Sequence, residues 1–247
     1  MEYENFKNST ILIGPKAVGK SFLASAKEQN GESEYVLSAD LLINMVAHKL
    51  AGTFHILEAD EKFAETVKKY KQDFELNNLA PQVYEMAKIV QMPNISETSR
   101  HAILQFWKAR FIENALKNLN QPVFIDASAD FGAVFSLNER EQSEVNSFLG
   151  MHQKTLADKH KEFLKRFGTV VYLKPGLTYS ESTEKRSHDT ANQIFISNPE
   201  SYSTFATLTL SADDLFEPSN NGTSPNEDKA KQLLAEIEAS KNQSSYQ

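Results

Sequence analysis

A glycine-rich turn follows a short apolar segment near the amino terminus, and this junction constrains the fold more than any other part of the sequence. The segment 10–13 is short, apolar and rich in β-branched residues, which is typical of a buried parallel strand. Residues 14–21 then read Gly-Pro-Lys-Ala-Val-Gly-Lys-Ser, and a helical pattern continues to Glu28. A strand, a glycine turn and a helix in this order predict the first unit of an α/β fold.

Four more apolar segments are expected to be strands, at 35–37, 123–125, 169–173 and 207–210. Charged segments with helical periodicity lie between or after them, at 58–88, 97–119, 139–166 and 228–238. Strands that alternate with helices predict a mostly parallel sheet covered on both faces. The expected fold class is therefore α/β, a three-layer α/β/α sandwich with about five strands and added helical segments.

The length of 247 residues suits one large α/β domain with an insertion. We expect this single domain to cover residues 1–238 and to carry a helical insertion at about 46–100. Residues 176–191 are polar and lack an apolar period, which predicts a lid over a binding site. A polar carboxyl-terminal tail is expected at 239–247.

The pattern Gly-x-x-x-x-Gly-Lys-Ser is the phosphate-binding motif known as the P-loop, or Walker A motif. Its glycines let backbone N–H groups surround phosphates, while the following helix presents its positive end. Lys20 would reach the β- and γ-phosphates of ATP, and the hydroxyl of Ser21 would bind Mg²⁺. The expected nucleotide-binding residues are Gly14, Pro15, Lys16, Ala17, Val18, Gly19, Lys20 and Ser21.

A second acidic residue is expected beside this loop. Asp126 directly follows the apolar segment 123–125, where it could hold Mg²⁺ together with Ser21. Asp130 is close enough in sequence to take the same role, and Asp126 could instead cap the segment that follows it.

The chain resembles the shikimate kinase family of small P-loop kinases. The similarity lies in the segments 11–21, 38–43, 109–116, 170–173, 198–206, 211–214 and 224–225, in the family's order. It implies an ATP-dependent phosphotransferase in which Asp40 orients the acceptor hydroxyl and serves as the base. It also implies that Arg110 holds a substrate carboxylate, and that a cation of the lid, Arg186, stabilises the transferred group.

Departures from the family's pattern concern the acceptor. The segment 126–132 replaces a triple-glycine turn, and Ser197 stands where the family has an arginine. We therefore expect the acceptor to be a small molecule other than shikimate. A larger acceptor such as a nucleoside or nucleotide sugar, or a regulatory role without transfer, stays open. Asp40 could also be a helix cap, and Arg110 a solvated cation.

The formal net charge of −7 disfavours general binding to nucleic acids and to membrane surfaces. The absence of cysteine excludes a thiolate nucleophile and a Cys-ligated metal. No apolar run approaches the roughly 18 residues that span a bilayer, so a cytoplasmic location is expected. The expected partners are a nucleotide and a small-molecule acceptor, and the oligomeric state stays open.

Overall fold

A five-stranded parallel sheet forms the centre of the protein. The computed structural model describes residues 4–15, 18–31, 34–117, 119–129, 134, 137–151, 155–174, 205–219 and 222–244. The sheet order is β2-β3-β1-β4-β5, and every neighbouring pair is parallel. The strands are β1 (Thr10–Ile13), β2 (Tyr35–Ser38), β3 (Val123–Ala129), β4 (Thr169–Lys174) and β5 (Leu208–Ser211). All five expected strands are present, and the predicted α/β class is confirmed.

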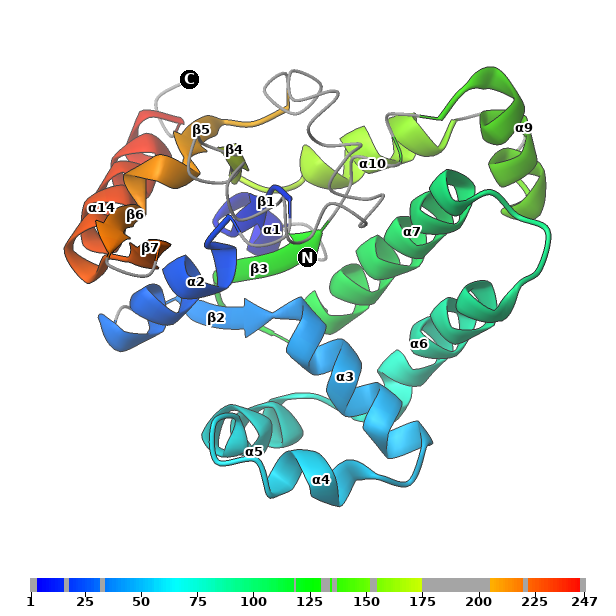
Figure 1. Ribbon diagram of the computed structural model, residues 1–247, viewed down its shortest axis with the longest axis horizontal. Coiled ribbons are helices and arrows are strands. Elements are labelled where there is room, and N and C mark those ends of the chain that lie inside the picture. The colour runs from blue at the N-terminus through cyan, green and yellow to red at the C-terminus, as the bar shows by residue number, and fades with distance from the viewer. Residues whose placement is uncertain are drawn as a thin grey trace.

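Helices cover both faces of this sheet (Figure 1). Successive side chains of a strand point to opposite faces, so Ile11 and Ile13 enter one apolar core and Leu12 enters another. The first core is completed by α3 (Ala39–Leu50), α7 (Glu97–Leu116) and α10 (Leu156–Leu164). The second is completed by α2 (Lys20–Gln29) and α14 (Glu227–Ser244). These two cores make the three layers.

The expected insertion contains three helices after α3, not one continuous helix. They are α4 (Phe54–Glu58), α5 (Ala64–Asp73) and α6 (Leu76–Gln91). Tyr70 of α5 is buried against the sheet, where its hydroxyl accepts a hydrogen bond from Ser38 N at 2.7 Å and donates one to Val36 O at 3.3 Å. Both partners belong to β2, which is an edge strand. Helix α5 thus covers backbone groups of β2 that an open edge would expose.

The charged segment 139–166 also divides, into α9 (Glu139–Phe148) and α10. Gly150 lies between them with φ 64°, a left-handed conformation that favours glycine and ends the first helix. Both helices start with a capping box, formed by Asn138 with Glu141 and by Thr155 with Asp158. The helical periodicity of the sequence continues through 139–166, but Gly150 and the second capping box divide the segment into two helices.

The carboxyl-terminal part contains an antiparallel pair that was not expected, β6 (Phe216–Ser219) and β7 (Gly222–Pro225), after the short helix η2 (Ala212–Asp214). The expected tail at 239–247 is helical as far as Ser244, because Lys241 of α14 binds Glu34 at 2.7 Å and Glu238 at 2.8 Å. The remaining helix, α1 (Glu4–Lys7), precedes β1.

The predicted lid at 176–191 lies outside the described residues. In the part of the chain that is described, no helix combines the length and the apolar character needed to cross a membrane.

Candidate functional site

The connections that follow β1 and β3 run in opposite directions from the carboxyl ends of these two adjacent strands. From β1 the chain passes through α2 to β2 at one edge, whereas from β3 it crosses to β4 on the other side of β1. In open α/β sheets ligands bind at such a switch point, outside the carboxyl ends of the strands. The glycine-rich loop follows β1 here, and Asp126 lies on the neighbouring β3.

The loop backbone requires glycine at two positions. Gly14 has φ 143°, and a Cβ there would lie 2.4 Å from Leu173 O of β4. Gly19 has φ 93°, and its Cβ would lie 2.9 Å from Leu215 Cδ1. Any other residue would be strained at both positions. Pro15 and Val18 are buried, while Lys16 and Ala17 lie outside the described residues.

Lys20 opens α2 and is buried, with 5% of its surface exposed. Its ammonium donates to Gly14 O at 2.9 Å and to Pro15 O at 2.6 Å. The charge of Lys20 is therefore held against the loop itself, at the positive end of a ten-residue helix. An anion bound by the backbone N–H groups of this loop would meet a full positive charge as well as the helix dipole.

Ser21 and Asp126 meet across the switch point, although 105 positions separate them. Ser21 Oγ donates to Asp126 Oδ2 at 2.6 Å, and the aspartate is only 2% exposed. Asp126 lies inside β3, in register with Leu12 of β1 and Ser38 of β2. The expectation that Asp126 stands at the end of its strand is wrong, because β3 continues to Ala129, and so is the alternative of a cap. Asp130 lies outside the described residues.

The pair Ser21–Asp126 suits Mg²⁺ because both groups offer hard oxygen ligands. Two protein ligands are fewer than Mg²⁺ requires, which fits an ion that also binds phosphates and water. Among the described residues no group of three or more His, Asp or Glu could hold a metal ion by itself.

Asp40 lies in the first turn of α3, two residues beyond the strand position that pairs with Asp126. The alternative that Asp40 caps this helix is wrong, because Ser38 is the N-cap and its Oγ accepts from Leu41 N at 3.4 Å. The carboxylate of Asp40 instead binds Lys108 Nζ of α7 at 2.5 Å. Asp40 is half exposed and Lys108 is nearly buried, so the pair lines the surface at the carboxyl edge of the sheet.

Lys108 was not among the expected site residues. Its only sequence signal is its position on the buried stripe of α7, three residues after Gln105 and four before Ile112. A lysine on such a stripe needs a nearby carboxylate as its counter-charge, and the sequence does not say which residue supplies it.

Arg110 does not join this group. It follows Lys108 by two positions, which rotates it by about 200° around the helix axis. Its guanidinium binds Glu113 at 3.0 Å and lies 5.5 Å from the ring centre of Phe106, on the side of α7 that faces α10. The expected catalytic residue Arg186 lies outside the described residues.

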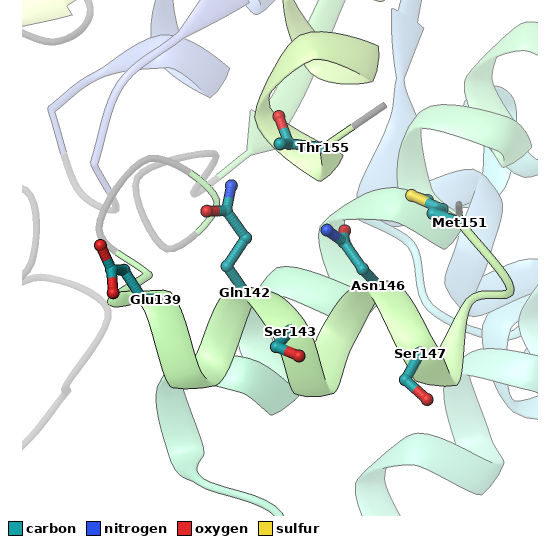
Figure 2. A pocket seen from close by; sticks show the side chains of 7 residues that line it. All are labelled: Glu139, Gln142, Ser143, Asn146, Ser147, Met151 and Thr155. Carbon is teal, nitrogen blue, oxygen red and sulfur yellow. The ribbon is translucent and has the colours of Figure 1, made fainter. Parts of the chain in front are cut away.

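A separate hollow of about 470 Å³ lies beside α9 and the start of α10. Figure 2 shows Gln142 and Asn146 of α9 pointing toward Thr155, with Ser143 and Ser147 on a neighbouring side of the helix. Its lining is mainly neutral and polar, and none of the expected site residues belongs to it.

In comparisons with known proteins, the sequence matches no protein-family model and no curated protein.

Proposed function

We propose that the protein binds ATP with Mg²⁺ at the loop 14–21 and transfers the γ-phosphoryl group to a hydroxyl of a small acceptor. The observation that carries this proposal is the contact between Ser21 and the buried Asp126 beside Lys20. A glycine turn alone is a common feature. A glycine turn whose lysine is buried in the loop, and whose serine meets an aspartate of the adjacent strand, supports a phosphate and metal site.

The residues of the loop would each act on the triphosphate. Backbone N–H groups of the turn and the amino end of α2 bind phosphate oxygens. Lys20 exchanges the carbonyls of Gly14 and Pro15 for oxygens of the terminal phosphates, which carry full negative charge. Bound Mg²⁺ supplies a Lewis acid that neutralises charge on the transferred group, and Ser21 and Asp126 are the residues that would hold it.

Asp40 and Lys108 would receive the acceptor in this scheme. The acceptor oxygen forms a bond to the γ-phosphorus while the bond to the bridging oxygen of ADP breaks, and Asp40 takes the hydroxyl proton. Lys108 fixes the carboxylate through their 2.5 Å contact, so it is a positioning residue in this scheme. Catalysis would then rest mainly on positioning and charge stabilisation.

Binding of a nonhydrolysable ATP analogue with Mg²⁺, measured by calorimetry, tests the site. We expect Ser21→Ala and Asp126→Asn to weaken the Mg²⁺-dependent part of binding by roughly tenfold or more, since each removes an oxygen ligand or a charge. Ser25→Ala is the matched control, because Ser25 lies one turn further along α2 and is exposed. Equal losses in Ser21→Ala and Ser25→Ala would contradict the metal assignment.

Acceptor-stimulated release of ADP tests the transfer step. A screen of polyols, nucleosides and nucleotide sugars should find an acceptor whose turnover falls at least a hundredfold in Asp40→Asn, since general-base catalysis typically contributes about 10²–10⁴-fold. Tight nucleotide binding without stimulation by any acceptor would contradict transfer and leave a nucleotide-binding regulator.

A further inference from the structure

A cavity of about 210 Å³ lies between α7 and α10, on the side of α7 opposite to Lys108. Its charged lining consists of Arg110 and Glu113 from α7, and of Lys159, Glu162 and Arg166 from α10 and the residues that follow it. We refer to it as the α7–α10 pocket. It contains neither the loop 14–21 nor Asp40 and Asp126, so the proposed nucleotide site does not include it.

Two guanidinium groups converge on one carboxylate in this pocket. Arg110 Nη1 binds Glu113 Oε2 at 3.0 Å, and Arg166 Nη1 binds Glu113 Oε1 at 2.6 Å. The side chain of Glu113 is 13% exposed, whereas those of Arg110 and Arg166 are 49% and 35% exposed. The carboxylate therefore lies deep while both cations reach the open part of the pocket.

The charges of the pocket do not cancel. Arg110, Lys159 and Arg166 contribute three positive charges, and Glu113 and Glu162 contribute two negative ones. One positive charge remains, in a chain whose net charge is −7. His160 adds none, because burial lowers its pKa to about 3 and keeps the ring neutral. Coulomb attraction to an anion is stronger in such a hollow than on an open surface, since less water screens it.

The remaining lining is uncharged and mostly apolar, and consists of Phe106, Ala109, His160 and Phe163. Phe106 lies beneath the guanidinium of Arg110, and Phe163 packs edge-on against His160 with ring centres 6.4 Å apart. A cavity of this volume has room for several water molecules, whose share of liquid volume is about 30 Å³ each. It can therefore hold a small anion or the anionic end of a small molecule, but not a whole nucleotide.

We propose that the α7–α10 pocket binds a small oxyanion, a carboxylate or a phosphate group, between Arg110, Arg166 and Lys159. Guanidinium groups match both anions with paired N–H donors. The site does not depend on the proposed kinase activity, because Lys108 and Arg110 point to opposite sides of α7. Arg110 would then bind an anion, as a carboxylate clamp does, but at a site other than the one that holds Asp40.

Calorimetric titration of the full chain with two probes tests this site, with inorganic phosphate as one and benzoate as the other. Both titrations use the Lys20→Ala background, which removes the main side-chain cation of the loop. We expect Arg110→Gln to weaken binding roughly ten- to a hundredfold, the loss that follows removal of a charged hydrogen bond. Arg140→Gln is the matched control, because Arg140 lies exposed on α9 outside the pocket, and it should change nothing.

The comparison of probes identifies the ligand's chemistry. Tighter binding of benzoate supports an organic carboxylate that uses the rings of Phe106 and Phe163, while tighter binding of phosphate supports a phosphoryl group. Binding of neither probe at millimolar concentration would overturn the proposal, as would equal affinities in Arg110→Gln and Arg140→Gln.

Chemical modification of arginine side chains with phenylglyoxal tests the site without a substitution in the pocket. In the chain with an intact pocket, the bound probe should slow modification of Arg110 and Arg166 but not of Arg140, as measured by peptide mass mapping. Equal rates at all three arginines with and without the probe would count against the site.

Discussion

Replacement of Tyr70 by phenylalanine should destabilise the protein through the edge of its sheet. Tyr70 is 1% exposed, and its hydroxyl bonds Ser38 N at 2.7 Å and Val36 O at 3.3 Å. Tyr70→Phe keeps the ring and its packing against Tyr35 and Phe74, whose ring centres lie 6.2 and 5.6 Å away. The variant therefore removes the hydroxyl group and little else.

The magnitude follows from the two backbone groups that lose their partner. A buried donor or acceptor left unsatisfied costs about 1–3 kcal/mol, and the short bond from Ser38 N dominates. We expect the free energy of unfolding to fall by about 1–3 kcal/mol, measured by urea denaturation with an unchanged m-value. Tyr84→Phe is the control, since Tyr84 is 57% exposed. A loss below about 0.5 kcal/mol, or one equal to that of the control, would refute the role of Tyr70 at the edge.

Three further predictions concern the loop, the pH dependence and the acceptor. Gly14→Ala should lower the melting temperature and weaken nucleotide binding more than Gly52→Ala does. A Cβ at Gly14 would lie 2.4 Å from Leu173 O, whereas one at Gly52 would meet nothing within 4 Å. Equal shifts of the melting temperature in calorimetry would contradict the steric argument. Burial lowers the pKa of His160 from 6.5 to about 3, so between these values the unfolded chain binds the extra proton and stability falls as the pH drops. Urea unfolding from pH 7 to 4.5 should show a slope that approaches about 1.4 kcal/mol per pH unit below about pH 5.5 and that His160→Gln lacks. Identical pH slopes in the two proteins would contradict this. Shikimate should be a poor acceptor, because Ser197 replaces an expected arginine and Arg110 lies away from Asp40; robust shikimate-dependent release of ADP would contradict this.

The parallel sheet could be predicted because each strand is a short apolar run beside a helical pattern. The bounds were less predictable where tertiary pairing overrides local preference. Residues 126–129 read Asp-Ala-Ser-Ala and have little strand propensity, yet β3 extends over them and pairs Asp126 with Ser38 of β2. The break at Gly150 was readable in principle, since glycine with a positive φ commonly ends a helix.

The candidate site also has a part that the sequence predicts and a part that it does not. Lys20 and Ser21 belong to one contiguous motif, so eight residues of sequence suffice to predict their neighbourhood. The rule that ligands bind at the carboxyl edge of adjacent parallel strands brought Ser21 and Asp126 together correctly, although Asp126 lies inside β3 and not at its end. The pairing of Asp40 with Lys108 depends on where the tertiary structure places α7 relative to α3, which periodicity does not determine. The resemblance implied that Arg110 holds a substrate carboxylate, and it implied no partner for Asp40, which the structure pairs with Lys108.

The most direct test of the central claim is the thermal shift caused by a nonhydrolysable ATP analogue with Mg²⁺, in the wild type and in Lys20→Ala. At a ligand concentration of 100 times the dissociation constant, a ligand that binds only the folded state adds about 2.7 kcal/mol of stability. We predict that the ligand clearly raises the melting temperature of the wild type. Most of this increase should be lost in Lys20→Ala, because the variant lacks the ammonium group that contacts the loop in the wild type. No shift in the wild type, or equal shifts in both proteins, would contradict nucleotide binding at this loop.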